Sequence, residues 1–291
     1  MDGEFMKKQD LHTEQLIEEY ITYLKRKNLA NNTISAYTYG VRLYFDHYND
    51  LNLANLHAFH EFLTIKYLPA SANQRIHGLN HFLLFLDEHH SEDFPDIINY
   101  RLLTVKLPKT SFQDSVISNA DCRKLQRKLK KDGYEFWYFV VRFLVTTGVR
   151  VSELTQIKVE HLAYGYLDLY SKGGKIRRIY MTDTLCEEAL LWCRSRKRTS
   201  GFLFVSRGGH PVTPRGIQYR LKQFAHLYGL DPDTVYPHSF RHRFAKNFLQ
   251  RCGDIALLAD ILGHESIETT RIYLTRSSKE QQLLLDDLVT W

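Results

Sequence analysis

Residues 103–117 show no hydrophobic periodicity, and they divide this chain of 291 residues into two parts. Before them, apolar residues recur every three or four positions, which is the spacing of one face of an α-helix. The stretch itself carries Lys106, Pro108 and Lys109, a composition typical of an extended basic connection. We therefore predict an N-terminal domain, a basic linker and a C-terminal domain, over 6–105, 106–117 and 118–291.

The N-terminal part consists of four amphipathic segments. In the first, from Glu14 to Leu24, apolar side chains recur at helical spacing, and three segments of the same kind follow. These three lie at 34–45, near 56–67, and from Pro69 to Leu86. We expect a four-helix bundle, a fold that by itself indicates no function.

The C-terminal part mixes helices with one hairpin. Strand-like residues at Tyr166–Tyr170 and Ile176–Met181 flank Ser171-Lys172-Gly173-Gly174, and a glycine pair between β-rich runs favours a tight hairpin. Helical patterns precede and follow it, and one of them runs from Ile255 to Leu262 and stops at Gly263. The predicted fold class is mainly α, with a small antiparallel β-sheet in a mostly helical C-terminal domain.

The basic residues are unevenly distributed. The chain carries 39 Lys and Arg against 33 Asp and Glu, a formal charge of +6. Residues 1–110 hold 11 of the former and 14 of the latter, so their net charge is −3, and residues 111–291 have a net charge of +9. Since the whole basic excess lies in the C-terminal part, we expect an anionic partner engaged chiefly by that part.

Some classes of protein and site do not fit the sequence. Charged residues interrupt every apolar run before it reaches the ~18 residues that a membrane helix needs. The four cysteines lack metal-binding spacing and are interpreted as thiols of a reducing cytoplasm. Ile176 follows Lys175, where a nucleotide-binding loop needs Ser or Thr. We expect a cytoplasmic protein with no membrane segment, nucleotide, metal or other cofactor.

Two short segments carry arginines in suggestive surroundings. In one, Gly148 allows a close bend, and Glu153 stands three residues after Arg150, where a carboxylate can hold a guanidinium group. Taken alone, this pair is most often a structural ion pair. In the other, His238 and Arg241 share one helix face. His242 stands four residues after His238, as metal ligands do, but Arg241 brings a cation there and no glutamate follows His238, which argues against a metal.

A third segment places a tyrosine behind a Gly-His pair. Tyr273 follows His264 by nine residues, and alone it is most often a core residue, because Ile272 beside it is apolar. Lys172, taken alone, is most often a solvated residue of a glycine turn. The order of all these residues is more informative. An arginine is followed by a lysine in a β-turn, by His-x-x-Arg, by Gly-His and then by the tyrosine.

This order resembles the tyrosine recombinase (phage integrase) family, and its spacing is most like that of the Xer-like bacterial members. The resemblance covers almost the whole chain. Residues around Tyr23-Leu24 and from Thr33 to Tyr37 are similar to the family's helical core-binding domain, which binds DNA. Residues 112–291 are similar to its catalytic domain.

The resemblance implies a role for each residue of the site. Arg150 and Arg241 would bind the non-bridging oxygens of the scissile phosphate, a task that planar guanidinium groups suit. His264 would donate another hydrogen bond to the phosphate, and His238 would assist proton transfers at the nucleophile. Lys172 would protonate the departing 5′ oxygen, and Lys175 is the alternative residue for this role.

Tyr273 would attack the phosphorus and form a 3′-phosphotyrosyl link. A tyrosine hydroxyl ordinarily has a pKa of about 10, and two neighbouring arginines favour its ionised form. The arginines also offset the charge of the transition state, and the phosphotyrosyl ester conserves the energy of the broken bond. The resemblance therefore implies a reaction that needs neither a metal ion nor ATP.

The implied partner is double-stranded DNA with a specific core site, recombined within a homo-tetramer through a Holliday junction. Arg177, Arg178 and Arg215 are candidate DNA contacts in the C-terminal domain. Candidates in the acidic N-terminal domain are Lys25, Arg26, Lys27, Arg42 and Arg75. The segment at about 277–291 carries a leucine stripe and would dock into a neighbouring subunit as an exchange tail, with packing against its own subunit as the alternative.

Three other functions compete with this one. The same fold can serve as a catalytically silent DNA-binding protein, and a topoisomerase of type IB uses similar chemistry without synapsis. A metal-dependent nuclease would need clustered acidic residues, which the sequence lacks. The sequence does not distinguish chromosome-dimer resolution, resolution of transposon cointegrates, and integration or excision of a mobile element.

Overall fold

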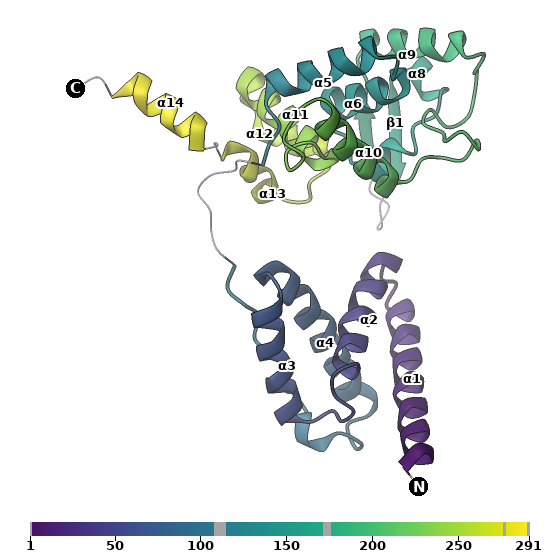
Figure 1. Ribbon diagram of the computed structural model, residues 1–291, viewed down its shortest axis with the longest axis vertical. Helices are drawn as coiled ribbons and strands as arrows, with labels where there is room; N and C mark the ends of the chain where they lie inside the picture. The colour runs from purple at the N-terminus through teal and green to yellow at the C-terminus, as the bar shows by residue number, and fades with distance from the viewer. Residues whose placement is uncertain (1, 108–114, 171–175, 276–277, 290–291) are drawn as a thin grey trace. The chain divides into compact units, whose positions relative to one another are not determined.

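The computed structural model describes residues 2–107, 115–170, 176–275 and 278–289. The chain divides into two compact units, Met1–Lys109 and Thr110–Trp291, each with its own hydrophobic core (Figure 1). None of the helices in the described ranges combines the length and the hydropathy that a membrane crossing requires.

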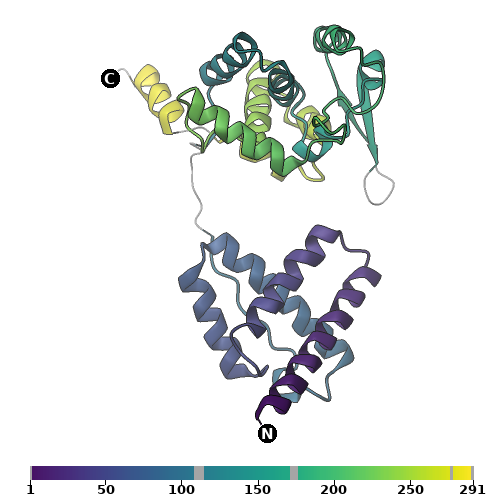
Figure 2. The same ribbon diagram turned by 45° about the vertical axis from the view of Figure 1, so that its right-hand side comes forward.

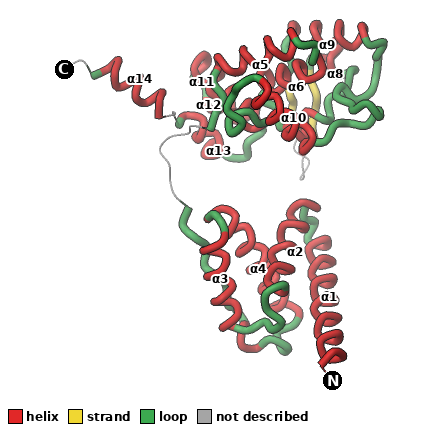
Figure 3. Tube along the Cα trace, in the orientation of Figure 1, coloured by secondary structure: helices red, strands yellow, loops and turns green. Residues whose placement is uncertain are grey.

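The first unit is built from helices (Figure 3). They are α1 (Asp2–Arg26), α2 (Asn31–Phe45), α3 (Leu53–Lys66) and α4 (Pro69–His89). Helices α2 and α4 pack closely because glycines stand at their crossing. A Cβ added at Gly78 would lie 2.9 Å from the carbonyl oxygen of Tyr37, and one at Gly40 would lie 2.9 Å from that of Arg75. Aliphatic and aromatic side chains share the core between the helices, and the fully buried rings are those of Tyr20, Tyr44, Phe59 and Phe82.

An extended segment follows the short 3-10 helix η1 (Pro95–Ile97) and stays attached to the first unit. The side-chain amide of Asn80 bonds both the N–H and the carbonyl of Leu102, at 2.8 and 2.9 Å. Asn73, two helical turns earlier on α4, holds Val105 in the same way, at 2.7 and 2.8 Å. The backbone up to Val105 is therefore fixed on α4.

The second unit combines helices with a two-stranded antiparallel sheet, the one sheet of the described residues. Its elements are α5 (Asn119–Lys131), α6 (Glu135–Thr147), α7 (Val151–Leu154), α8 (His161–Tyr164), β1 (Tyr166–Tyr170), β2 (Ile176–Tyr180), α9 (Asp183–Ser195), α10 (Pro214–Leu227), α11 (Pro237–Cys252), α12 (Ile255–Leu262), α13 (Ile267–Arg271), η2 (Ile272–Leu274) and α14 (Ser278–Leu288). The predicted fold class, mainly α with a small antiparallel sheet, is confirmed.

The hairpin pairs β1 with β2 in a register that places Asp168 opposite Arg178 and Leu169 opposite Arg177. Figure 2 shows the two strands running side by side. Because side chains alternate between the faces of a strand, Arg177 and Arg178 point to opposite sides. The turn between the strands, with Lys172 and Lys175, lies outside the described residues.

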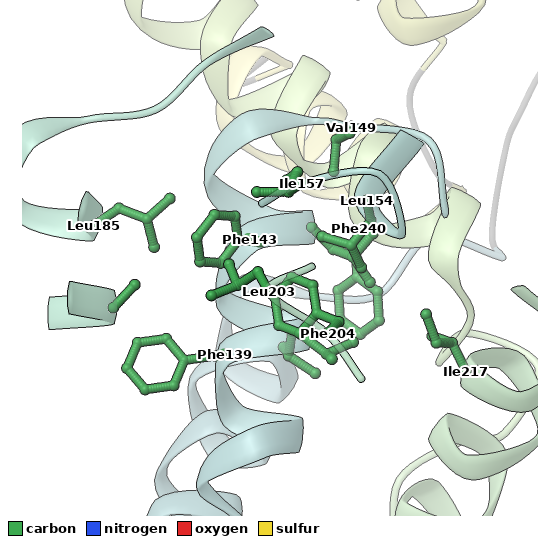
Figure 4. Close-up of a cluster of buried hydrophobic side chains, with 14 of the residues drawn as sticks. Phe139, Phe143, Val149, Leu154, Ile157, Leu185, Leu203, Phe204, Ile217 and Phe240 are labelled. Carbon is green, nitrogen blue, oxygen red and sulfur yellow. The ribbon is translucent and has the colours of Figure 1, made fainter. Parts of the chain in front are cut away.

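The core of the second unit forms around α6 (Figure 4). Phe143 of this helix meets Phe204 edge to face, with ring centroids 5.4 Å apart, and Phe139 and Phe240 are buried in the same cluster. Burying each such ring stabilises the fold by roughly 1.5–3 kcal/mol. Since Phe240 belongs to α11, this packing also holds α11 against α6, and the C-terminal end of α6 leads directly into the site.

Candidate active site

A tight bend after α6 delivers the first arginine of the site. Gly148 ends the helix in the left-handed conformation, with φ of 63°. A Cβ on Gly148 would lie 2.4 Å from Cδ1 of Phe244, so both the backbone conformation and the space favour glycine here. The chain then turns at Arg150 and enters α7.

Glu153 fastens Arg150 and also a second arginine. Its Oε2 accepts a hydrogen bond from the backbone N–H of Arg150 at 2.8 Å, and its Oε1 accepts one from Nη1 of Arg150, also at 2.8 Å. Nη1 of Arg177 contacts the same Oε1. Burial acts to raise the pKa of Glu153, but the charge of Arg177 and the hydrogen bonds from both arginines outweigh it, so the pKa is lowered. An ionised Glu153 thus holds two guanidinium groups.

Arg177 ties the hairpin to the end of α12. Its Nε donates to the carbonyl of Ile261 at 3.1 Å, and a Cβ at Gly263 would lie only 2.1 Å from its Cδ. The glycine that ends α12 therefore makes room for this side chain. Burial and the charge of Arg150 lower the pKa of Arg177, against the effect of Glu153. Arg177, which the sequence suggested as a DNA contact, lies mostly inside the protein.

Arg241 joins three segments of the second unit. It lies on α11 with 2% of its surface exposed. Its Nη1 donates to the carbonyl of Gly148 and its Nη2 to that of Leu262, each at 2.7 Å. Burial first, and Arg150 second, lower the pKa of Arg241 to about 10, so the guanidinium stays charged at neutral pH. Helix α11, the bend after α6 and the end of α12 converge on this one cation.

His264 lies between Arg241 and the segment that carries the tyrosine. Its Nε2 is 3.1 Å from Nη2 of Arg241, and its Nδ1 is 2.7 Å from Oγ1 of Thr270. Burial, followed by the charges of Arg241 and Arg150, lowers the pKa of His264 to about 4. The imidazole is consequently neutral at pH 7.

Tyr273 lies in η2, with 5% of its surface exposed. Its ring is stacked on that of His264, with centroids 5.8 Å apart, and meets His242 edge to face at 4.8 Å. Its other neighbours include Leu258 and Leu262, the apolar side of α12. Tyr273 is thus buried in a small hydrophobic cluster and also lies beside the arginines of the site.

His238 stands in the first turn of α11 and is exposed. Partial desolvation of its ring, and then the charges of Arg241 and Arg150, lower its pKa. The structure therefore brings together Arg150, His238, Arg241, His264 and Tyr273, whereas Lys172 lies outside the described residues.

The other two candidate DNA contacts differ from each other. Arg178 forms a double hydrogen bond with Asp168, at 2.7 Å for each contact, and lies over the ring of Tyr166 at 3.8 Å. Its charge is therefore locally neutralised. Arg215 is exposed in the first turn of α10, whose N-cap is Thr213, and the backbone N–H groups of this turn also attract anions.

Sequence reasoning missed the contacts of His242 and Thr270. The spacing of His242 from His238 suggests only a metal ligand, whereas the ring of His242 packs on Tyr273. Thr270 is fully buried against His264. Among the described residues no group of three or more His, Cys, Asp or Glu is arranged to hold a metal ion.

A cleft of about 1050 Å³ opens between the hairpin and the end of α12. Arg150, Arg177 and His264 line it, together with Lys158 and Tyr170. The basic groups of the site therefore border a concave surface that an anionic ligand can approach.

The chain is similar to known proteins in both sequence and fold. Residues 117–280 match the model of the Phage integrase family. The chain is 29% identical to the tyrosine recombinase XerA of Pyrococcus furiosus over 98% of its own length and 99% of the relative's. It is 28% identical to the tyrosine recombinase XerD of Staphylococcus epidermidis over 91% and 95%. The XerH site-specific recombinase, solved in a post-cleavage complex with its palindromic difH substrate, has a similar fold, with a TM-score of 0.69, 20% identity and coverage of 95% of this chain and 84% of that one.

Proposed function

Because this chain belongs to the phage integrase family, as a tyrosine recombinase of the Xer-like type, we propose that it cleaves and rejoins double-stranded DNA at a specific core site through a 3′-phosphotyrosyl link. The observation that carries the proposal is the meeting of Arg150, Arg241 and His264 beside the buried ring of Tyr273. Site-specific recombination is the activity of the family. The roles of individual residues, the link to DNA and the assembly are proposed.

The two arginines bind the scissile phosphate. Guanidinium groups donate to two oxygens at once, and a planar guanidinium fork matches the geometry of a phosphate. Glu153 fixes Arg150, and three contacts fix Arg241, so the donors are oriented before DNA arrives. Donors that are oriented in advance at a developing negative charge are each worth about 10²–10³ in rate.

The transfer step is a displacement at phosphorus. The hydroxyl oxygen of Tyr273 forms a bond to phosphorus while the bond to the 5′ oxygen breaks. His238 accepts the tyrosine proton, and its lowered pKa leaves it neutral and able to do so at pH 7. Lys172 gives a proton to the departing 5′ oxygen, a role that rests on its position in the sequence pattern, with Lys175 as the alternative.

The reaction needs no metal ion and no ATP. The guanidinium groups of Arg150 and Arg241 supply the positive charge that a metal ion would otherwise provide. The phosphotyrosyl ester stores the energy of the cleaved phosphodiester, and attack by a free 5′ hydroxyl releases the tyrosine and reseals the strand.

Recombination takes place in a homo-tetramer through a Holliday junction, for resolution, integration or excision. The exposed leucines of α14 support an exchange of tails between subunits. Leu283, Leu285 and Leu288 have 59, 55 and 59% of their surface exposed. At the other end of the helix, Glu280 pairs with the buried Lys246 of its own subunit at 2.9 Å. We propose that this ion pair anchors the start of the tail while the leucines dock into a neighbouring subunit.

The proposal is tested by trapping the covalent intermediate without knowledge of the target. Nicked fragments of genomic DNA from the source organism are incubated with the protein in EDTA, denatured, and recovered with the protein. The wild type is expected to retain a narrow set of DNA sequences, and Tyr273→Phe none. Retention by Tyr273→Phe, or no retention by a folded wild type, contradicts the proposal.

A further inference from the structure

Thr270 contacts His264 but has no role in the reaction steps described above. Its side chain is fully buried, and its Oγ1 lies 2.7 Å from Nδ1 of His264. The other ring nitrogen, Nε2, faces Nη2 of Arg241 at 3.1 Å. Both ring nitrogens of His264 are therefore within hydrogen-bonding distance of a partner.

The chemistry of these partners fixes the proton on the ring in the DNA-free protein. A guanidinium group has hydrogen-bond donors only, so Nε2 of His264 must accept from Arg241. A neutral imidazole with a free electron pair on Nε2 carries its proton on Nδ1. That proton points to Oγ1 of Thr270, which accepts it. The lowered pKa of His264 agrees with a neutral ring.

The proposed reaction needs the opposite arrangement. A ring that donates to a phosphate oxygen must carry its proton on Nε2, and Nδ1 must then accept. A backbone carbonyl beside Nδ1 would forbid this state, because a carbonyl only accepts. A threonine hydroxyl can donate as well as accept.

We propose that Thr270 is a positioning residue that allows His264 to change tautomer when a phosphate enters the site. In the DNA-free protein the hydroxyl of Thr270 accepts from Nδ1. With phosphate bound, the hydroxyl turns and donates to Nδ1, and Nε2–H donates to the phosphate oxygen. One proton leaves Nδ1 and one arrives at Nε2, exchanged with water at the partly exposed ring, so the charge of His264 does not change.

The first test measures the tautomer directly and does not depend on the proposed function. Histidine labelled with ¹⁵N and ¹³C gives distinct ring shifts for the two neutral forms. In the DNA-free wild type at pH 7.5, His264 is expected as the Nδ1–H form, identified by its loss from the spectrum of His264→Gln. A ring protonated at Nε2 in this state overturns the inference.

The second test rests on the proposed function and uses the rate of covalent trapping on the recovered DNA sequences. Thr270→Val keeps the shape but can neither donate nor accept, so trapping should slow by about 10-fold or more. Thr270→Ser keeps the hydroxyl and should stay within about 3-fold of the wild type. Thr269→Val is the matched control, because Thr269 is the exposed neighbour.

The two tests separate the inference from the function on which it builds. If the wild type traps DNA and Thr270→Val traps it at the same rate, the inference is wrong and the proposed function stands. If Thr270→Ser is as slow as Thr270→Val, the hydroxyl is not the required group, and the inference is again wrong. If the wild type traps nothing, the proposed function fails, and the NMR spectrum still decides the tautomer of the free protein.

Discussion

The carboxylate of Glu153 and the guanidinium of Arg177 form an ion pair in which each side chain is only 11% exposed. Arg150 shares the same carboxylate oxygen. Glu153→Gln would leave two guanidinium groups close together without a counter-charge, so we expect the free energy of unfolding to fall by about 3 kcal/mol. Urea denaturation at pH 7 measures this loss.

The matched control for Glu153→Gln is Asp168→Asn, whose partner Arg178 stands next to Arg177 on the hairpin. The pair of Asp168 and Arg178 is more exposed, at 27 and 43%, and such pairs contribute about 1 kcal/mol or less. Equal losses in the two variants would show that Glu153 and Arg177 do not brace the site.

The hairpin also shows which features of the site the sequence pattern can predict. The position of the strands and the order of Arg150, His238, Arg241, His264 and Tyr273 can be read from the residues. The inward direction of Arg177 could not, because Ile176 and Ile179 have opposite parity along β2 and suggest opposite inner faces. Only the burial of Ile179 decides it.

The contacts of Thr270 and His242 depend on packing between distant segments. His264 and Thr270 are six residues apart, and the turn after Gly263 brings them together. His242 meets Tyr273 because α11 packs against η2. The residue spacing within one helix cannot predict such contacts between segments. The amphipathic helices of the first unit could be predicted, because each depends only on the spacing of its own apolar residues.

Stability is expected to depend on two partly buried histidines, His242 and His264, between pH 4 and 6.5. The folded-state pKa of His242 and of His264 is about 4, whereas a histidine in the unfolded chain titrates near 6.5. Between these values the unfolded chain binds more protons, so the free energy of unfolding rises with pH and is lost as the pH falls from about 6.5 to 4.

Urea denaturation of the wild type and of His242→Asn, at pH 7 and at pH 5, measures this dependence. The midpoint of the wild type should fall more than that of the variant, which lacks the contribution of His242. A fall of equal size in both proteins would show that His242 is not held in its neutral form by burial.

Gly148→Ala is expected to impair both folding and trapping. The substitution meets an unfavourable φ of 63° and a clash with Phe244, so a loss of about 2 kcal/mol or more is expected. Gly133→Ala is the control for the backbone conformation alone, because the φ of Gly133 is 75° but nothing lies within 4 Å of the added Cβ. This substitution should lower the free energy of unfolding by about 1 kcal/mol. If the Gly148→Ala protein were as stable as the Gly133→Ala protein, the predicted clash with Phe244 would be contradicted.

The tail is expected to matter for assembly more than for DNA binding. Deletion of residues 279–291 removes the exposed leucines of α14 together with Glu280. Recombination of two sites should be lost, while the Kd for one site, measured by gel shift, should change by less than about 3-fold. Equal loss of both activities would count against tail exchange, and no loss of either would favour packing against the same subunit.

The central claim is that Tyr273 itself becomes joined to DNA, and mass spectrometry of the trapped complex tests it most directly. After nuclease and protease digestion, a nucleotide is expected on the peptide that contains Tyr273. The DNA should be attached through its 3′ phosphate, and the other broken end should carry a 5′ hydroxyl. A nucleotide on any other residue, or attachment through a 5′ phosphate, would contradict the account.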